Sequence, residues 1–80
     1  MKLYERINKC VMEALEVDKS ISMVEELMGL GMDSLSTVKL VILLEDEFNI
    51  KFNDDELFYE NFSTIKKIEM LVNDRVEEEN

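Results

Sequence analysis

Hydrophobic side chains recur at helical spacing near the start of the chain. From Leu3 to about Val17, apolar residues return every three or four positions, which places them on one face of an amphipathic helix. These residues are Leu3, Ile7, Val11, Ala14 and Leu15. Cys10 lies beside this apolar face, so we expect its thiol to be packed rather than reactive.

A weaker pattern follows over residues 18–33, where apolar residues are scattered among polar ones. They are Ile21, Met23, Leu27, Met28 and Leu30. The two glycines of the chain, Gly29 and Gly31, also fall here. We therefore expect a long, partly ordered connection that packs some apolar side chains onto the helices. A connection of this length in a small domain is uncommon and usually functional.

A second helix is predicted from Ser34 to Asn49, with Asp33 as its N-cap. At about 100° per residue, this helix has two apolar stripes instead of one. The stripe assigned to the core consists of Thr37, Leu40, Val41, Leu44 and Phe48. The other stripe, centred roughly 160° away, consists of Leu35, Val38 and Ile42. Leu43 is one more apolar residue, on the polar side of the helix.

The second stripe has two explanations, and the helical wheel does not choose between them. The helix can lie in the middle of the bundle, buried on both sides. Alternatively, the stripe is an exposed apolar strip bordered by carboxylates, as partner-docking surfaces are. Glu45 projects between the two stripes and Asp46 lies on the polar side.

The last third of the chain predicts two further helices. A short third helix can begin after Asn53 and occupy Asp54 to Asn61, because Asn53 and Glu56 resemble a capping box. A fourth helix is predicted from near Ser63, its N-cap, to about Val76. Its apolar face consists of Ile65, Ile68, Leu71, Val72 and Val76. The only alternating stretch, 49–53, is too short for a sheet, so the fold class is a small all-α bundle.

Composition restricts the chemistry that the chain can perform. Its 80 residues have room for one domain, 1–80, with residues 77–80 as a frayed acidic tail. A single cysteine and no histidine exclude an internal disulfide and any Ser-His or Cys-His pair. Zinc is improbable on one thiol, and the acidic stretch 53–60 lacks a calcium-loop pattern. We therefore expect no catalytic residue and no metal site.

The net charge of −10 comes entirely from residues 21–80, which hold five basic and fifteen acidic side chains. This balance argues against nucleic acid and against anionic membrane surfaces. No apolar run approaches the length of a membrane span, so we expect a soluble, cytoplasmic protein. The acidity either serves solubility or forms a docking face for basic partners.

The segment from Gly31 to Leu35 places a serine hydroxyl on the first turn of the second helix. A helix N-terminus favours a phosphate group, and Gly31 permits a positive φ before it. A phosphodiester on Ser34 would be stabilised there, although Asp33 opposes it slightly unless a visiting enzyme holds a cation. Alternatively, Asp33 and Ser34 are simply an N-cap and a first helical residue.

These residues resemble the acyl carrier proteins. The resemblance rests on Gly31-Met32-Asp33-Ser34-Leu35, then on Thr37-Val38 and Leu44-Glu45-Asp46-Glu47-Phe48, and it extends over nearly the whole chain. It implies a four-helix bundle with a long loop after the first helix and a short third helix.

The resemblance also implies a function. Ser34, beside Asp33, would carry 4′-phosphopantetheine, transferred from coenzyme A by a magnesium-dependent phosphopantetheinyl transferase, and the thiol of that arm would hold acyl or aminoacyl groups as thioesters. The residues implied to meet partner enzymes are Leu35, Val38, Ile42, Glu45 and Asp46. The implied partners are the transferase, a loading ligase or acyltransferase, and ketosynthase or condensing enzymes. We expect a monomer.

Some features depart from the fatty-acid type of carrier. Ser36 and Lys39 stand where that type usually has acids, and the stretch 54–61 is about two residues longer. The sequence Leu57 to Ile65 looks more like the discrete carriers of polyketide and nonribosomal-peptide pathways. A prosthetic-group-free acidic adaptor is the alternative function. Two roles are possible for Leu44, Phe48, Leu57, Phe58 and Ile65. They either line a shelter for the cargo or form part of the plain core.

Overall fold

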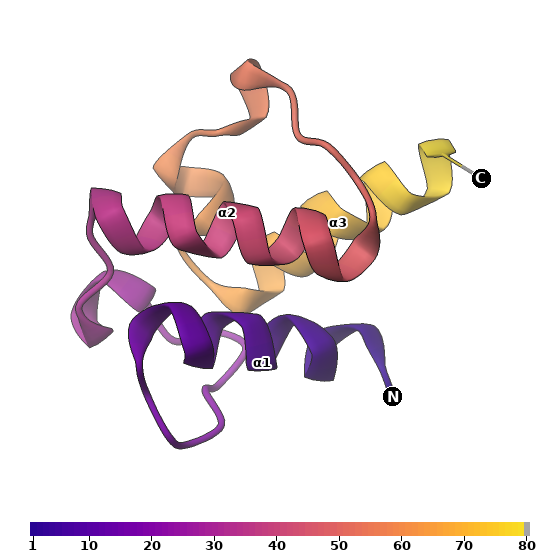
Figure 1. Ribbon diagram of the computed structural model, residues 1–80. Helices are drawn as coiled ribbons and strands as arrows, with labels where there is room; N and C mark the ends of the chain where they lie inside the picture. The colour runs from indigo at the N-terminus through magenta and orange to yellow at the C-terminus, as the bar shows by residue number, and fades with distance from the viewer. Residues whose placement is uncertain (80) are drawn as a thin grey trace.

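Three α-helices and three short 3-10 helices form the fold. The computed structural model describes residues 1–79, with side chains to residue 76. The elements are α1 (Leu3–Leu15), η1 (Leu27–Leu30), α2 (Ser34–Phe48), η2 (Asp54–Glu56), η3 (Tyr59–Phe62) and α3 (Ile65–Glu79). α1 packs against both α2 and α3, and α3 passes behind α2 in Figure 1. Residues 1–79 contain no strand, so the predicted all-helical class is confirmed.

The first two helices end at residues in the left-handed conformation. α1 ends at Leu15, two residues before the predicted Val17, because Glu16 takes φ 55°. The N–H of Val17 then donates to the carbonyl of Met12 at 2.9 Å, which satisfies a carbonyl at the helix end. α2 ends one residue earlier than predicted, since Asn49 adopts φ 54° and caps it.

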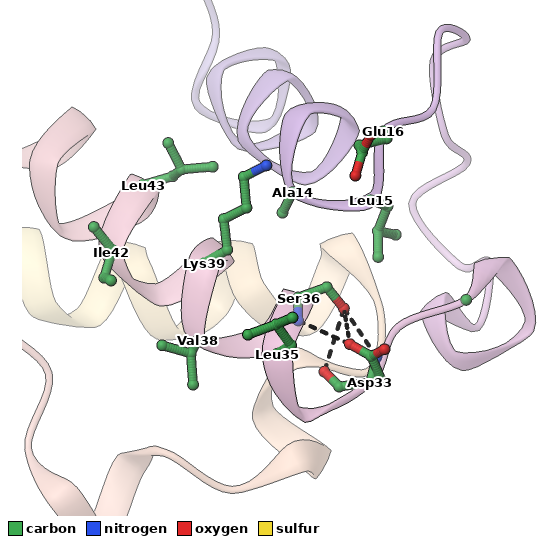
Figure 2. A pocket seen from close by; sticks show the side chains of 11 residues that line it. Ala14, Leu15, Glu16, Asp33, Leu35, Ser36, Val38, Lys39, Ile42 and Leu43 are labelled. Atoms are coloured by element: carbon green, nitrogen blue, oxygen red, sulfur yellow. Dashed lines mark hydrogen bonds between the residues drawn. The ribbon is translucent and has the colours of Figure 1, made fainter.

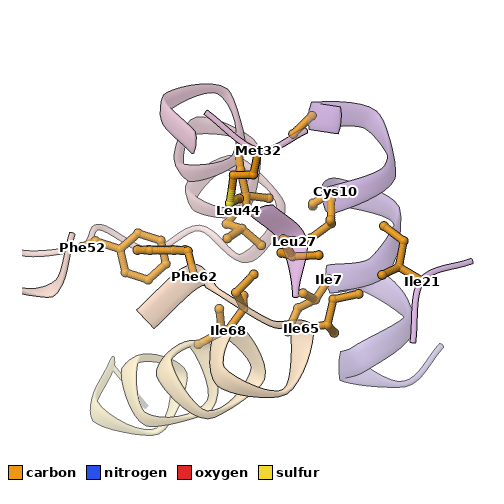
Figure 3. Close-up of a cluster of buried hydrophobic side chains, with 14 of the residues drawn as sticks. Ile7, Cys10, Ile21, Leu27, Met32, Leu44, Phe52, Phe62, Ile65 and Ile68 are labelled. Carbon is orange, nitrogen blue, oxygen red and sulfur yellow. The ribbon is translucent and has the colours of Figure 1, made fainter. Parts of the chain in front are cut away.

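The core lies where the three helices meet (Figure 3). On α2, Leu40 and Leu44 are fully buried, and Val41 and Phe48 pack partly against the cluster, as the first stripe predicts. The other completely buried side chains are Ile7, Val11, Leu27, Phe62, Ile65, Ile68 and Val72. Cys10 is buried as well, in agreement with its predicted packing.

The connection between α1 and α2 is anchored by its apolar residues and by hydrogen bonds. Ile21, Leu27 and Met32 are buried, whereas Met28 is exposed. The side-chain amide of Asn8 brackets Ile21, donating to its carbonyl at 2.7 Å and accepting from its N–H at 3.1 Å. The expectation of a partly ordered, packed connection is therefore confirmed, with Met28 as the exception.

The short third helix takes a different form from the one predicted. Residues 54–61 form no α-helix; η2 and η3 occupy the stretch, and Phe58 between them is extended. The predicted pairing of Asn53 with Glu56 does occur, since the N–H of Asn53 donates to Glu56 Oε1 at 2.7 Å. Arg75 of α3 forms an ion pair with the same carboxylate, and Asn61 Nδ2 donates to the carbonyl of Glu56 at 2.8 Å. These contacts tie the segment down without an α-helix.

The start of α3 also differs from the prediction. Ser63 is not its N-cap: this residue is buried and its hydroxyl donates to the carbonyl of Glu60. Thr64 takes the role, because its Oγ1 accepts from the N–H of Lys67 at 3.2 Å. The tail expected to fray at 77–80 falls at the end of α3 and beyond; Asn80 and the side chains of 77–79 are outside the described part. Among the described residues, no helix is both long and apolar enough to cross a membrane.

Candidate functional site

The site is built on the N-terminus of α2, which a reciprocal pair of side chains caps. Asp33 is the N-cap that the sequence predicts. Its Oδ1 accepts from the N–H of Ser36 at 2.8 Å, and Ser36 Oγ accepts from the N–H of Asp33 at 2.9 Å (Figure 2). The carbonyl of Asp33 also accepts from the hydroxyl of Thr37 at 2.7 Å. Three side chains and the backbone thus fix the first turn.

Ser34 lies on this turn with its side chain exposed to solvent. Gly31, at φ 98°, ends η1 and turns the chain into the helix, so a residue with a Cβ would be strained there. Among the described side chains and backbone, no group forms a hydrogen bond with the Ser34 hydroxyl, whereas the hydroxyls of Ser36 and Thr37 are engaged. Ser34 therefore offers a free hydroxyl at the positive end of a helix dipole, which fits a phosphodiester attachment.

The carboxylate of Asp33 places a negative charge next to Ser34. Hydrogen bonds from the backbone and side chain of Ser36 lower the pKa of Asp33, so the group is ionised at neutral pH. A phosphate transferred to Ser34 would meet this charge, and a divalent cation held between them would offset the repulsion. Asp33 thus fixes the turn and keeps a negative charge beside Ser34.

The second apolar stripe is exposed, which decides between the two explanations offered by the sequence. Leu35 is 79% exposed, Val38 57% and Ile42 60%. Figure 2 shows these side chains pointing away from the core on the outer side of α2. The alternative of a helix buried on both sides is therefore wrong, and the stripe is an apolar strip open to solvent.

The acidic residues near this strip have different surroundings. Asp46 is exposed. Glu45 is half-buried: its Oε2 accepts from the N–H of Phe52 at 2.9 Å, and its Oε1 lies 3.7 Å from Lys51 Nζ. Glu45 therefore holds the chain that follows α2, a role that its position on the wheel does not indicate.

An open groove runs beside the strip, between α2 and the end of α1. Its volume is about 620 Å³. The groove is lined by Ala14, Leu15, Glu16, Gly31, Asp33, Leu35, Ser36, Val38, Lys39, Ile42 and Leu43. Sequence analysis missed this feature, although Leu43, apolar on the otherwise polar side of α2, was a signal: it packs partly against the core beside α1.

Of the residues considered as a cargo shelter, Leu44, Phe48 and Ile65 lie in or against the core, whereas Leu57 and Phe58 do not. Leu44 and Ile65 are fully buried in the core. Leu57 and Phe58 are exposed, at 41% and 62%. Phe48 is half-buried, with the Arg6 guanidinium 4.4 Å from its ring centre. The core explanation holds for Leu44 and Ile65.

Comparison with known proteins decides the family. Acyl carrier proteins from three strains of Buchnera aphidicola subsp. Acyrthosiphon pisum (Tuc7, 5A and APS) are each 38% identical to the chain over 65 residues. The aligned part covers 79% of the chain and 79% of each relative. The family described as phosphopantetheine attachment site matches residues 5–72. The chain belongs to the acyl carrier protein family.

Membership confirms the carrier function that the resemblance implies. The chain is a carrier and not a catalyst, and its cofactor is covalently attached 4′-phosphopantetheine, whose thiol supplies the thioester chemistry. A carrier interacts with the enzymes that modify it and with those that handle its acyl groups. Within the described residues, no three Cys, Asp or Glu side chains cluster closely enough to hold a metal ion.

Proposed function

We propose that Ser34 is the residue to which 4′-phosphopantetheine is attached. The observation that carries the proposal is the exposed Ser34 hydroxyl on the first turn of α2, which has no hydrogen-bond partner in the described part of the structure. The helix dipole favours the phosphate, and the cap formed by Asp33 and Ser36 fixes the turn that presents the hydroxyl. Ser36 itself is less suited to attachment, because its hydroxyl is part of that cap.

The exposed strip of α2 is proposed as the docking face for partner enzymes. Leu35, Val38 and Ile42 supply apolar contact area, and Asp46 supplies an exposed carboxylate at one end. Glu45 belongs to the proposed face as well, although most of its carboxylate is engaged with Phe52 and Lys51. Charge attraction would speed the encounter with basic partners, and a small contact suits a carrier that must leave again.

The proposed partners follow from the carrier role. They are a phosphopantetheinyl transferase that uses coenzyme A, a ligase or acyltransferase that loads the arm, and ketosynthase or condensing enzymes that take the cargo. The pathway is fatty-acid, polyketide or nonribosomal-peptide synthesis, and the sequence from Leu57 to Ile65 favours a dedicated pathway of the last two kinds.

The proposal extends to the organisation of the chain. Residues 1–80 form one carrier domain, which is supported by the one buried cluster found among the described residues. Within it, η2 and η3 stand in the place of the short third helix, so that the fold is a variant of the four-helix bundle. The protein is proposed to act as a monomer in the cytoplasm.

The test is transfer from coenzyme A. The protein is incubated with coenzyme A, Mg²⁺ and a phosphopantetheinyl transferase, and its intact mass is measured. The wild type and the control Ser20→Ala, which changes an exposed loop serine, are expected to gain the mass of one phosphopantetheinyl group. Ser34→Ala is expected to gain nothing. A mass gain in Ser34→Ala would overturn the assignment, and an unmodified wild type would favour the adaptor that lacks a prosthetic group.

A further inference from the structure

We propose that the groove between the end of α1 and α2 is a resting site for the protein's own phosphopantetheine arm. The inference rests on the proposed attachment at Ser34 and adds a place for the arm on the surface. The groove lies on the α1 side of α2 and is open to solvent, with the core residue Ala14 in its lining. The arm would therefore rest on the surface of the folded protein and require no opening of the core.

The groove begins beside the attachment residue. Asp33, Leu35 and Ser36, the neighbours of Ser34 in sequence, all line it. From there its lining continues along α2 through Ile42 and Leu43. Leu35 and Ile42 are seven positions apart on the helix, which is about 10 Å along its axis, a distance that an extended phosphopantetheine arm covers.

The lining matches the chemistry of the arm. Pantetheine combines a geminal dimethyl group with two amides and a terminal thiol. Ala14 and Leu15 of α1 line the groove together with Leu43 and the exposed strip of α2, so its lining is mostly apolar (Figure 2). The side chain of Lys39 extends across the groove toward α1. No carboxylate among the described residues pairs with its ammonium, which is thus available to donate to an amide carbonyl.

The size of the groove also suits such an occupant. At about 620 Å³ it falls within the range of about 300–1,000 Å³ that is typical of sites for drug-sized molecules. Such sites are mostly apolar with a few polar groups, as this one is. Leu35, Val38 and Ile42 leave apolar area uncovered. An arm attached at Ser34, on the same helix, can cover this area without the entropy loss of binding a second molecule.

The proposal has a mechanistic consequence. Leu35, Val38 and Ile42 belong both to the groove and to the proposed docking face. An arm in the groove and a partner on the strip therefore compete for the same side chains. Docking of a partner releases the arm from the surface, and departure of the partner allows it to return.

The experiment is methyl NMR on the holo protein, made with coenzyme A and a transferase and verified by intact mass. Nuclear Overhauser cross-peaks are sought between the geminal methyls of the arm and methyls of the protein. We expect cross-peaks to Leu15, Ile42 and Leu43. The variant Ile42→Glu should abolish the shift changes that modification causes at Leu15. The control Met70→Glu, at an α3 residue of similar exposure, 61% against 60%, should preserve them.

The outcomes separate the two proposals. A wild type without added mass contradicts the attachment of the cofactor and thus the proposed function. A modified protein whose arm gives no cross-peaks to the groove, or gives them only to core residues such as Leu44, overturns the resting site and leaves the attachment intact. Equal effects of Ile42→Glu and Met70→Glu on Leu15 also overturn it.

Discussion

The guanidinium of Arg6, on α1, lies 4.4 Å from the centre of the Phe48 ring at the end of α2. The same group donates to the Glu47 carboxylate at 2.8 Å and to the Glu47 carbonyl at 3.0 Å. One side chain therefore joins the beginning of α1 to the end of α2 through a cation–π contact, an ion pair and a bond to a helix carbonyl. This contact links the two helices that also line the groove, at the end of α2 opposite Ser34.

Replacement of Arg6 should therefore lower stability by more than an exposed charge usually contributes. We expect Arg6→Ala to reduce the free energy of unfolding by about 1 kcal/mol, the sum of a modest cation–π contact and a partly exposed ion pair. Arg6→Lys should recover only part of the lost stability, because lysine lacks the planar fork of donors with which the guanidinium reaches both the carboxylate and the carbonyl of Glu47. Urea denaturation measures both, with exposed Lys9→Ala as the control. An Arg6→Ala variant as stable as Lys9→Ala would contradict the role.

The cap of α2 predicts a dependence of stability on pH. Hydrogen bonds from Ser36 hold the folded pKa of Asp33 below its unfolded value. Its contribution to stability is therefore complete above the unfolded pKa of about 3.9 and is lost as the pH falls through the folded pKa. The variant Asp33→Asn lacks the carboxylate, so this part of its stability does not change with pH. Urea midpoints measured from about pH 6 to about pH 3 should fall less steeply for the variant than for the wild type.

Glu56 gives the background for that measurement. Burial raises its pKa, but the N–H of Asn53 and the guanidinium of Arg75 lower it overall. The pKa of Glu56 is thus shifted in the same direction as that of Asp33. Glu56 titrates in both the wild type and Asp33→Asn. The difference between the two curves isolates Asp33, and two parallel curves would show that its carboxylate makes no net contribution to the cap.

The sequence predicted the helices better than it predicted their ends and surroundings. Asp33 as N-cap and Leu40 and Leu44 as core follow from local chemistry and period, and the structure has them. The cap of α3 did not follow, because Ser63 and Thr64 are chemically alike and tertiary contact decides between them. The carbonyl of Ser63 accepts from the N–H of Leu27 at 2.9 Å, and this bond draws Ser63 into the core.

The candidate site shows the same limit. A helical wheel places Leu35, Val38 and Ile42 on one stripe, but whether anything covers them depends on how α2 sits in the fold. Likewise, the wheel locates Glu45 between the stripes but cannot show that the chain returns to place Phe52 N–H against it. The position of Ser34 was predictable because the N-cap next to it fixes the first turn.

The two stripes of α2 predict responses of very different size when a side chain is truncated. Leu44→Ala removes a fully buried side chain and should cost about 2–5 kcal/mol of unfolding free energy. Val38→Ala removes one that is 57% exposed and should change stability by no more than about 0.5 kcal/mol. Urea denaturation measures both. A large loss in Val38→Ala would mean that the strip is packed in solution.

The reactivity of Cys10 provides a check on the core. Burial, together with the charges of Glu47 and Glu13, raises the pKa of its thiol to about 11, although Arg6 acts in the opposite direction. At about pH 8 the thiol is therefore protonated and shielded. Ellman's reagent should react slowly with the native protein and quickly in about 6 M guanidinium chloride. Rapid reaction without denaturant would contradict the packing of α1 on α2.

The most direct test of the central claim is to locate the phosphopantetheinyl group on the chain. The protein modified by transferase and coenzyme A is digested, and the fragment that contains Ser34, Ser36 and Thr37 is analysed by tandem mass spectrometry. These three hydroxyls lie on one turn of helix, so the measurement separates the exposed one from the two engaged in the cap. The account predicts the added mass on Ser34 alone. The added mass on Ser36 or Thr37, or on a residue elsewhere in the chain, would contradict it.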